Sequence, residues 1–305
     1  MKTARLLYLL FFACAFNCLL PLSVSGQKIF QKTFRNYADG AYDFIMKNDS
    51  EFYFFGFSDP STNNFDQPLI MKTDADANII WSYVYGDTAY ITHAIDNGDG
   101  LVVFGEYTSA VSMFSTDIDY FVMKVDYNGN IIWQKRYGTD GYDFGQITPA
   151  ADGGYLLTGS SRHIDQLLNI DSTFLTIIKL DSLGNFQWDK FYSIGIDPQI
   201  RKTFQLADST FLMVGYTVDT VNGYGKGLLL KSDFYGNLLW GKEYADSLND
   251  LFFLNAVQAN DFSITCCGYF DSNNYIAFLM QLDTSGSILC LRNMVHQIFL
   301  SHYFI

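Results

Sequence analysis

The sequence predicts an all-β protein, a β-propeller of about five four-stranded blades, because two patterns repeat along the chain with one period. The four tryptophans are separated by 52, 55 and 52 residues. A run of apolar and β-branched residues that ends in glycine recurs at nearly the same period, and Gly, Asn and Asp lie between the runs. A fragment of a larger ring, or an open solenoid, would show the same period.

The phrase before each tryptophan has the form Asp-x-x-Gly-Asn-x-x-Trp. Its copies read KTDADANIIW, KVDYNGNIIW, KLDSLGNFQW and KSDFYGNLLW. A fifth copy, QLDTSGSILC, has Cys290 in the place of tryptophan, and Phe30 lies 51 residues before Trp81. If Phe30 and Cys290 are counted, this strand occurs six times and the other strands five times. Such a surplus fits a ring in which a strand from one end of the chain completes a blade begun at the other.

The aspartate and the glycine of this phrase predict a hairpin turn. The aspartate accepts hydrogen bonds from the turn amides, and glycine adopts a positive φ without steric cost. Ala77 replaces the glycine in one copy, which predicts a strained or differently shaped turn there. Each tryptophan is expected to lie as an apolar plate between neighbouring sheets. The residues assigned to this structural motif are Asp74, Trp81, Asp126, Gly129, Trp133, Asp181, Gly184, Trp188, Asp233, Gly236, Trp240, Asp283 and Gly286.

Each repeat unit is predicted to contain four short strands. In the second full copy, we expect the tryptophan strand from Ile131 to come first. Segments near 146–150, 155–159 and 174–180 then supply the other three strands. No convincing amphipathic helix is found.

The first 26 residues have the layout of a signal peptide. Lys2 and Arg5 precede an apolar run over 6–22, and small residues lie before Gln27, where we expect cleavage. The chain then divides into a signal peptide (1–26), a repeat domain (27–291) and an atypical tail (292–305). We expect a protein that is secreted or held at the cell surface.

The apolar run of this first segment is too short for a membrane anchor. A span needs about twenty continuous apolar residues, and Asn17 interrupts the run. We therefore expect no membrane span. Acylation at Cys14 or Cys18 would give a lipoprotein, which is the alternative.

The remaining chain is acidic and poor in cysteine. The net charge of −13 becomes −15 when Lys2 and Arg5 are removed. An acidic surface repels phosphate backbones, so nucleic acid is not an expected partner. Only Cys266, Cys267 and Cys290 remain after cleavage, too few for a disulfide scaffold, so the stability must come from a core. We expect a monomer whose partner is an extracellular protein or glycan.

Two segments carry a family resemblance. The phrases DYNGNIIWQKRYG from Asp126 and DGGYLLTGSS from Asp152 resemble the secreted propeller-repeat proteins that are abundant in Bacteroidota. The tryptophan phrase is also similar to the docking repeat of quinoprotein propellers. The resemblance covers about 29–291 and implies export, often by type IX secretion, while most members lack a known activity. After Leu291 the chain departs from this family, because neither a sorting module nor a further repeat follows.

No group of residues in the sequence predicts catalysis, so no catalytic or cofactor-binding residue is assigned. Adjacent cysteines are known in quinoprotein dehydrogenases, so the adjacent Cys266 and Cys267 raise the possibility of redox chemistry. In this sequence they lie in an apolar strand, which favours buried thiols. The histidines show no metal-ligand spacing within a repeat; they are His93, His163, His296 and His302.

Calcium is the one metal for which the sequence offers candidate ligands. The acidic loops at 96–100 and at Asp117 and Asp119 supply carboxylate oxygens. Hairpin turns use the same residue types for backbone reasons. Neither loop follows the twelve-residue calcium pattern.

The leading functional hypothesis is a non-catalytic extracellular binding or interaction scaffold. It depends on a regular repeat without a catalytic insertion. The alternative is a secreted polysaccharide-directed hydrolase whose carboxylates converge on the propeller funnel. A quinone-dependent enzyme is a third class, which depends on the paired cysteines.

Overall fold

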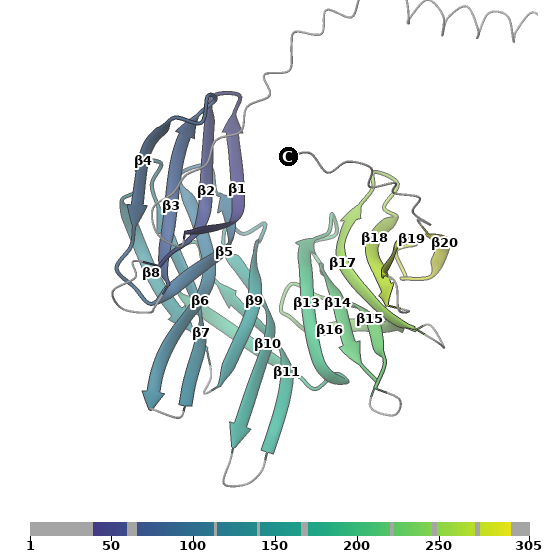
Figure 1. Cartoon of the computed structure of the whole chain (residues 1–305). Coiled ribbons are helices and arrows are strands. Elements are labelled where there is room, and N and C mark those ends of the chain that lie inside the picture. Colours follow the sequence, from purple (N-terminus) through teal and green to yellow (C-terminus); the bar gives the residue numbers. More distant parts are fainter. Residues whose placement is uncertain are drawn as a thin grey trace, which may run out of the picture. The chain divides into compact units, whose positions relative to one another are not determined.

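The computed structural model describes residues 39–59, 66–112, 115–138, 141–165, 170–219, 223–245, 249–271 and 275–293 (Figure 1). All of them belong to one compact unit, 36–305. The predicted signal peptide, Phe30 and residues 294–305 of the predicted tail lie outside the described residues. The described part forms 20 β-strands and contains no helix, so the all-β prediction is confirmed.

The strands form five successive antiparallel meanders, which we name sheet 1 to sheet 5. Sheet 1 comprises β1 (Gly40–Asn48), β2 (Glu51–Ser58), β3 (Gln67–Asp74) and β4 (Ile79–Val84). Sheet 2 comprises β5 (Ala89–Asp96), β6 (Leu101–Ser112), β7 (Ser115–Val125) and β8 (Ile131–Tyr137). Sheet 3 comprises β9 (Tyr142–Pro149), β10 (Tyr155–Asp165), β11 (Ile170–Leu180) and β12 (Phe186–Tyr192).

Two further sheets follow. Sheet 4 comprises β13 (Ile196–Gln205), β14 (Phe211–Val218), β15 (Gly225–Ser232) and β16 (Leu238–Tyr244). Sheet 5 comprises β17 (Asp250–Gln258), β18 (Ile264–Asp271), β19 (Tyr275–Leu282) and β20 (Ile288–Asn293). One parallel pairing, Ile118 with Tyr142, joins sheets 2 and 3 into a continuous eight-stranded sheet.

The tryptophan strand ends each sheet, whereas the sequence pattern led us to expect that it begins one. Trp133 on β8 lies opposite Lys124 on β7, so it pairs with the strand before it and not with β9. The same pairing places Trp81 opposite Lys72 and Trp188 opposite Lys179. A period gives the length of the repeat unit but not the residue at which each sheet starts.

Apolar clusters lie between consecutive sheets. The cluster between sheets 1 and 2 contains Tyr53 and Phe55 from β2 and Leu101 and Val103 from β6. Three similar clusters join sheets 2 and 3, 3 and 4, and 4 and 5. The middle strands, which supply most of these residues, therefore read as apolar runs because both of their faces are buried.

Candidate functional site

The Asp-x-x-Gly-Asn phrase forms the turn between the third and fourth strands of each sheet. In sheet 2 the Asp126 carboxylate accepts hydrogen bonds from the backbone N–H groups of Asn128 and Asn130, at 2.8 and 2.9 Å. Gly129 has a φ of +84° and donates its N–H to the Asp126 carbonyl. The aspartates of the other four sheets, Asp74, Asp181, Asp233 and Asp283, make equivalent contacts.

Each tryptophan packs against the turn glycine of the following sheet. A Cβ atom added to Gly184 would lie 2.8 Å from the Trp133 ring, and one added to Gly236 would lie 2.5 Å from the Trp188 ring. Only a glycine leaves room for the indole, so the motif glycine serves both the turn and the contact between sheets. Trp81 lies 3.2 Å from the Cβ position of Gly129, where Tyr83 is nearer at 2.5 Å, and Trp240 lies 3.2 Å from that of Gly286, where the Tyr244 hydroxyl is nearer at 3.0 Å.

A tyrosine four residues after each tryptophan completes this contact, and the sequence analysis missed it. Tyr85 donates its hydroxyl to the carbonyl of Gly129 at 2.9 Å. Tyr137, Tyr192 and Tyr244 do the same to the turn glycine of the following sheet. The spacing Trp-x-x-x-Tyr was visible in the four copies. We call the tryptophan, the tyrosine and the glycine that they contact the latch.

Ala77 occupies the glycine position of the first turn. Its φ is +55°, a conformation that side chains rarely adopt, so the predicted strain is present. The turn nevertheless has the ordinary shape, because Ala77 and Asp74 make the same backbone hydrogen bonds as their counterparts in other sheets.

In the four copies that open with lysine, this side chain forms an ion pair with an acidic residue at or beside the turn between the first two strands. Lys124 contacts Asp99 at 2.8 Å, and Lys179, which is fully buried, contacts Asp152 at 2.7 Å. Asp99 belongs to the acidic loop considered for calcium. The described residues contain no group of three or more His, Cys, Asp or Glu side chains placed to hold a metal ion.

The adjacent cysteines point to opposite faces of sheet 5. Cys266 is fully buried in the apolar cluster between sheets 4 and 5, and burial raises the pKa of its thiol to about 12. Cys267 is half-buried, and both thiols are free, as is that of Cys290. A thiol with a raised pKa is a poor nucleophile, so this geometry gives no support to a redox centre at the pair.

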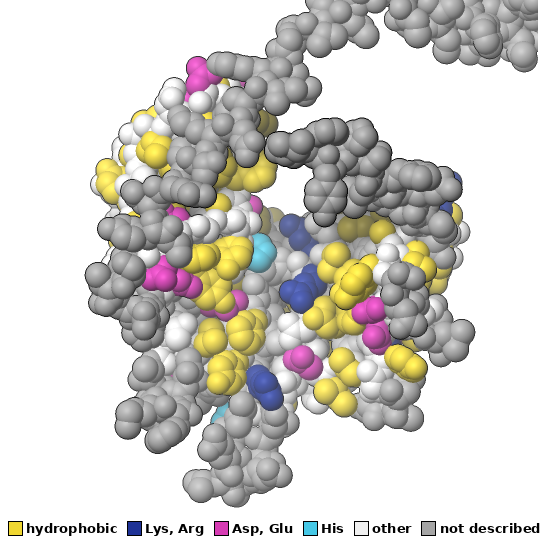
Figure 2. Space-filling view, viewed as in Figure 1, with side chains coloured by type: hydrophobic (Ala, Val, Ile, Leu, Met, Phe, Trp, Pro, Cys, Tyr) yellow, Lys and Arg dark blue, Asp and Glu magenta, His cyan; other side chains and the backbone are white. Residues whose placement is uncertain are grey.

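His93 lies near charges from two other sheets. Burial lowers its pKa, Asp43 on β1 raises it, and Lys202 on β13 lowers it. The Asp43 carboxylate also accepts the N–H of Ala94 at 2.8 Å. Figure 2 shows Lys and Arg side chains over β13. His163 is exposed, and His296 and His302 lie outside the described residues.

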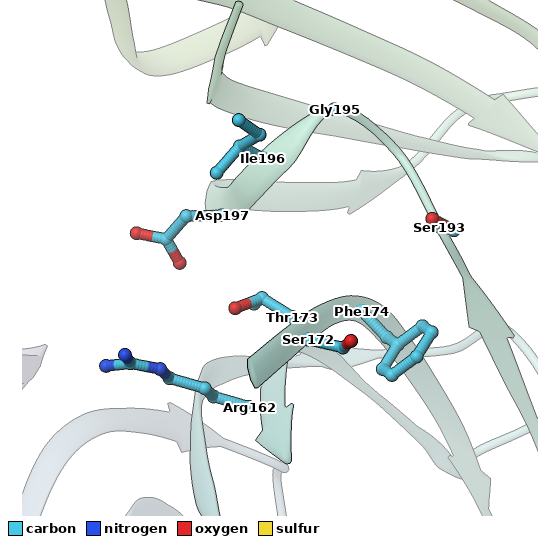
Figure 3. Close-up of a pocket in the computed structure, with 8 residues that line it drawn as sticks. All are labelled: Arg162, Ser172, Thr173, Phe174, Ser193, Gly195, Ile196 and Asp197. Atoms are coloured by element: carbon cyan, nitrogen blue, oxygen red, sulfur yellow. The ribbon is translucent and has the colours of Figure 1, made fainter. Parts of the chain in front are cut away.

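A pocket of about 410 Å³ lies where the hairpin of sheet 3 meets the first strand of sheet 4 (Figure 3). Figure 3 shows Arg162 and Asp197 on opposite sides of the opening with Thr173 between them. Phe174 and Ser193 lie toward the other end. The full lining is Arg162, Ser172, Thr173, Phe174, Ser193, Gly195, Ile196 and Asp197.

The wall that carries Asp197 has an unusual backbone. Gly195 has a φ of +56° and Asp197 a φ of +51°. The buried hydroxyl of Thr217 donates to the carbonyls of Ile194 and Ile196, at 3.3 and 3.0 Å, and so holds the segment on both sides of Gly195. The Gln199 amide donates to the Asp197 carboxylate at 2.9 Å. A positive φ strains a non-glycine residue such as Asp197, and the surrounding structure has to hold it in place.

Two other carboxyl groups are buried between sheets 2 and 3. Glu106 accepts the hydroxyl of Tyr90, and burial raises the pKa of its carboxyl. Asp143 has no exposed surface, and the pKa of the fully buried Tyr120 phenol is raised first by burial and then by the nearby Asp143 charge. A substrate cannot reach these groups, so they are part of the core.

Neither the family models nor the curated proteins that were compared include a match to this chain. Within the described residues there is no apolar helix of the length that a bilayer span requires.

Several solved structures are similar in backbone arrangement. A mutant of the Synechocystis apocarotenoid oxygenase matches with a TM-score of 0.45 and 11% identity, over 81% of this chain and 58% of that chain. An endo-arabinase from Bacteroides thetaiotaomicron gives 0.43 and 11%, over 81% and 94%. A mannose phosphorylase from Leishmania mexicana with phosphate gives 0.44 and 10%, over 88% and 94%. This chain spans less than two thirds of the oxygenase, and at these identities no activity is transferred.

Proposed function

We propose that the protein is a non-catalytic extracellular binding module, a β-propeller-type repeat of five four-stranded blades, whose pocket between sheets 3 and 4 takes one residue of a glycan. The observation that carries this proposal is the placement of Arg162 and Asp197 on opposite sides of a 410 Å³ pocket. Ligand pockets typically enclose about 300–1,000 Å³ and contain a few convergent polar groups. This pocket meets both conditions, the volume and the convergent polar groups.

The chemistry of the lining favours a polyhydroxylated ligand. Arg162 offers only donors and the carboxylate of Asp197 only acceptors, while the hydroxyls of Ser172, Thr173 and Ser193 offer both. A sugar ring presents donors and acceptors around its edge and an apolar face to an aromatic ring such as Phe174. A purely apolar ligand would displace water from these polar groups without replacing its hydrogen bonds, which costs binding energy.

The lining gives less support to the polysaccharide-directed hydrolase. Glycosidic hydrolysis ordinarily needs two carboxyl groups about 5–10 Å apart. Among the described residues that line the pocket, Asp197 is the one carboxylate. Glu106 and Asp143 are buried elsewhere in the core. The described lining therefore has the groups to hold a sugar but does not supply a second acid or base.

The sequence supports a location outside the cytoplasm. Residues 1–26 have the charge and hydropathy order of a signal peptide. The net charge of −13 disfavours polyanions such as nucleic acid, so an uncharged or mixed glycan is the better partner. The protein then works as a secreted or surface-held glycan receptor.

A glycan array followed by titration calorimetry tests the proposal. We expect the purified chain to bind a subset of neutral polysaccharides, and Asp197→Asn and Arg162→Ala each to weaken binding at least tenfold, equivalent to about 1.4 kcal/mol. Arg201→Ala is the matched control, because Arg201 contacts Tyr216 and lies outside the pocket lining.

The outcomes separate the candidate functions. Binding that survives both pocket substitutions would remove the pocket from the proposal. Release of reducing sugar from a bound polysaccharide would replace the receptor with the hydrolase.

A further inference from the structure

The strand register assigns each residue of the middle strands to one of two faces. We call the face toward the following sheet the forward face, and the face toward the preceding sheet the back face. In β6, Leu101 and Val103 pack on sheet 1, whereas Val102 and Phe104 pack on sheet 3. The glycine that ends each apolar run, Gly105 in this sheet, aligns the five sheets position by position.

No sheet of the described part of the chain covers the back face of sheet 1, although its residues are those of an interface. Its members Phe52 and Phe54 correspond to Leu101 and Val103 of sheet 2. Phe52 and Phe54 are half-buried, whereas the equivalent pairs in sheets 2 to 5 are at most 1% exposed. Leu69 and Met71 on β3 are half-buried in the same way.

The neighbouring first strand extends this apolar surface. Phe44 and Met46 on β1 are 63% and 58% exposed, and Phe44 stacks on Phe54 with ring centroids 6.4 Å apart. Figure 2 shows hydrophobic side chains at the surface over this sheet. A contiguous exposed apolar face of this kind indicates an interaction surface.

Among the described residues, no sheet covers the forward face of sheet 5 either. Thr265 and Cys267 on β18 correspond to Tyr53 and Phe55 of sheet 1, and Leu279 on β19 corresponds to Ile70. All three are half-buried, while the equivalent residues of sheets 1 to 4 have no exposed surface. No apolar cluster joins sheets 1 and 5 within the described part of the chain.

The two uncovered faces carry side chains of complementary size. Sheet 5 presents the small Thr265 and Cys267, and sheet 1 presents the large Phe52 and Phe54. In the interface between sheets 1 and 2 the order is reversed, because Tyr53 and Phe55 meet Leu101 and Val103. Close packing needs a matched total volume, so a small face fits a large one.

The latch positions of sheet 1 and sheet 5 also have side chains of complementary size. Ala77 carries a methyl group where the other turns need glycine to receive an indole. Cys290 on β20 is small where the other sheets have tryptophan. The turn at Ala77 cannot receive a tryptophan, and β20 at the other end of the series has no tryptophan to place there.

We propose that the forward face of sheet 5 in one copy of this chain binds the back face of sheet 1 in a second copy. The contact continues the interface that already joins sheets 1 to 5, with Cys290 placed over the Ala77 turn. It is heterologous, so it links copies head to tail and closes only if the rotation allows it. This proposal replaces the expectation of a monomer and does not depend on the glycan pocket.

Disulfide trapping tests the proposed pairing. Ala77→Cys is combined with Cys266→Ala and Cys267→Ser, so that Cys290 is the one other thiol after export. We expect oxidation to give dimers and longer ladders on a non-reducing gel, and reduction to reverse them. An internal disulfide, seen as a monomer that has lost two hydrogens, would overturn the proposal in favour of a ring closed within one chain. The absence of any cross-link would overturn it outright.

Sedimentation velocity of the unmodified chain provides a second readout. We expect the sedimentation coefficient to rise with concentration, and Phe54→Asp to abolish that rise. Tyr235→Asp is the matched control, because Tyr235 is 67% exposed in a turn of sheet 4, away from both faces. For the disulfide-trapping experiment, Ala77→Cys combined with Cys290→Ser controls for adventitious oxidation. A monomer at every concentration, or an equal effect of Tyr235→Asp, would contradict the proposal.

Discussion

The interface between sheets 4 and 5 and the interface between sheets 2 and 3 have the same latch but different interiors. Between sheets 4 and 5, Phe278 packs against Phe253 and Phe270 with ring centroids 5.8 and 4.8 Å apart. Between sheets 2 and 3, the positions of Phe278 and Phe270 are occupied by Thr176 and Ser161. The Thr176 hydroxyl donates to that of Ser161 at 2.7 Å.

This difference shows that the same latch is compatible with interiors of different chemistry. In both interfaces a tryptophan and a tyrosine contact the turn glycine of the next sheet. The interior then needs only to be filled with apolar groups or with polar groups that find hydrogen-bond partners. The ligand pocket lies at the hairpin of sheet 3, the sheet with the polar interior.

The largest effect is expected when the polar interior is copied into the apolar interface. Phe278→Thr removes a ring that is 1% exposed and buries a hydroxyl among apolar side chains. We expect a loss of about 3–5 kcal/mol in the free energy of unfolding, from the cavity and the hydroxyl without a partner. Urea denaturation followed by tryptophan fluorescence measures it.

The matched control is Thr176→Val, which removes one hydrogen bond and conserves the shape. We expect a loss of about 1 kcal/mol. Equal losses for the two variants would show that the interiors do not differ in kind.

A smaller effect should be the same in both interfaces. Tyr137→Phe and Tyr244→Phe each remove a hydroxyl that donates to a turn carbonyl while the ring stays in place. We expect each to lower the free energy of unfolding by about 1 kcal/mol, since a buried carbonyl loses its partner. If only one variant is destabilised, the latch does not act equally in the two interfaces.

The sequence predicted the period and the turns of the repeat, but it missed the role of the repeated tyrosine and the residues of the pocket. The tryptophan period and the aspartate turns follow from residues present in several copies, so chance agreement was easy to exclude. Asp197 shares a Gly-x-Asp spacing with Asp143 of the preceding copy, but the Asp143 carboxyl is buried. Arg162 lies 35 residues before Asp197 in the chain, so nothing in the sequence joins Arg162 to Asp197. The Trp-x-x-x-Tyr spacing was available but needs the structure to show that the tyrosine serves the next sheet.

The smallest effect concerns the acidic interior between sheets 2 and 3. Burial raises the pKa of Glu106 above its usual value of 4.5, so the folded chain keeps this proton at pH values where the unfolded chain has lost it. The contribution of the Glu106 carboxyl to the free energy of unfolding is therefore complete below pH 4.5. It is lost as the pH rises through the pKa that this carboxyl has in the folded chain. Glu106→Gln cannot ionise, and its amide oxygen still accepts the hydroxyl of Tyr90.

We expect Glu106→Gln to be more stable than the wild type at neutral pH, with the advantage shrinking as the pH falls toward 4.5. Thermal denaturation of both proteins across this range measures it. The sheet 4–sheet 5 interface has Phe270 and Phe278 in its interior and supplies the control, because Phe278→Leu there should shift stability by the same amount at every pH. A pH-independent difference for Glu106→Gln would mean that this carboxyl titrates normally and that the two interiors do not differ in their electrostatics.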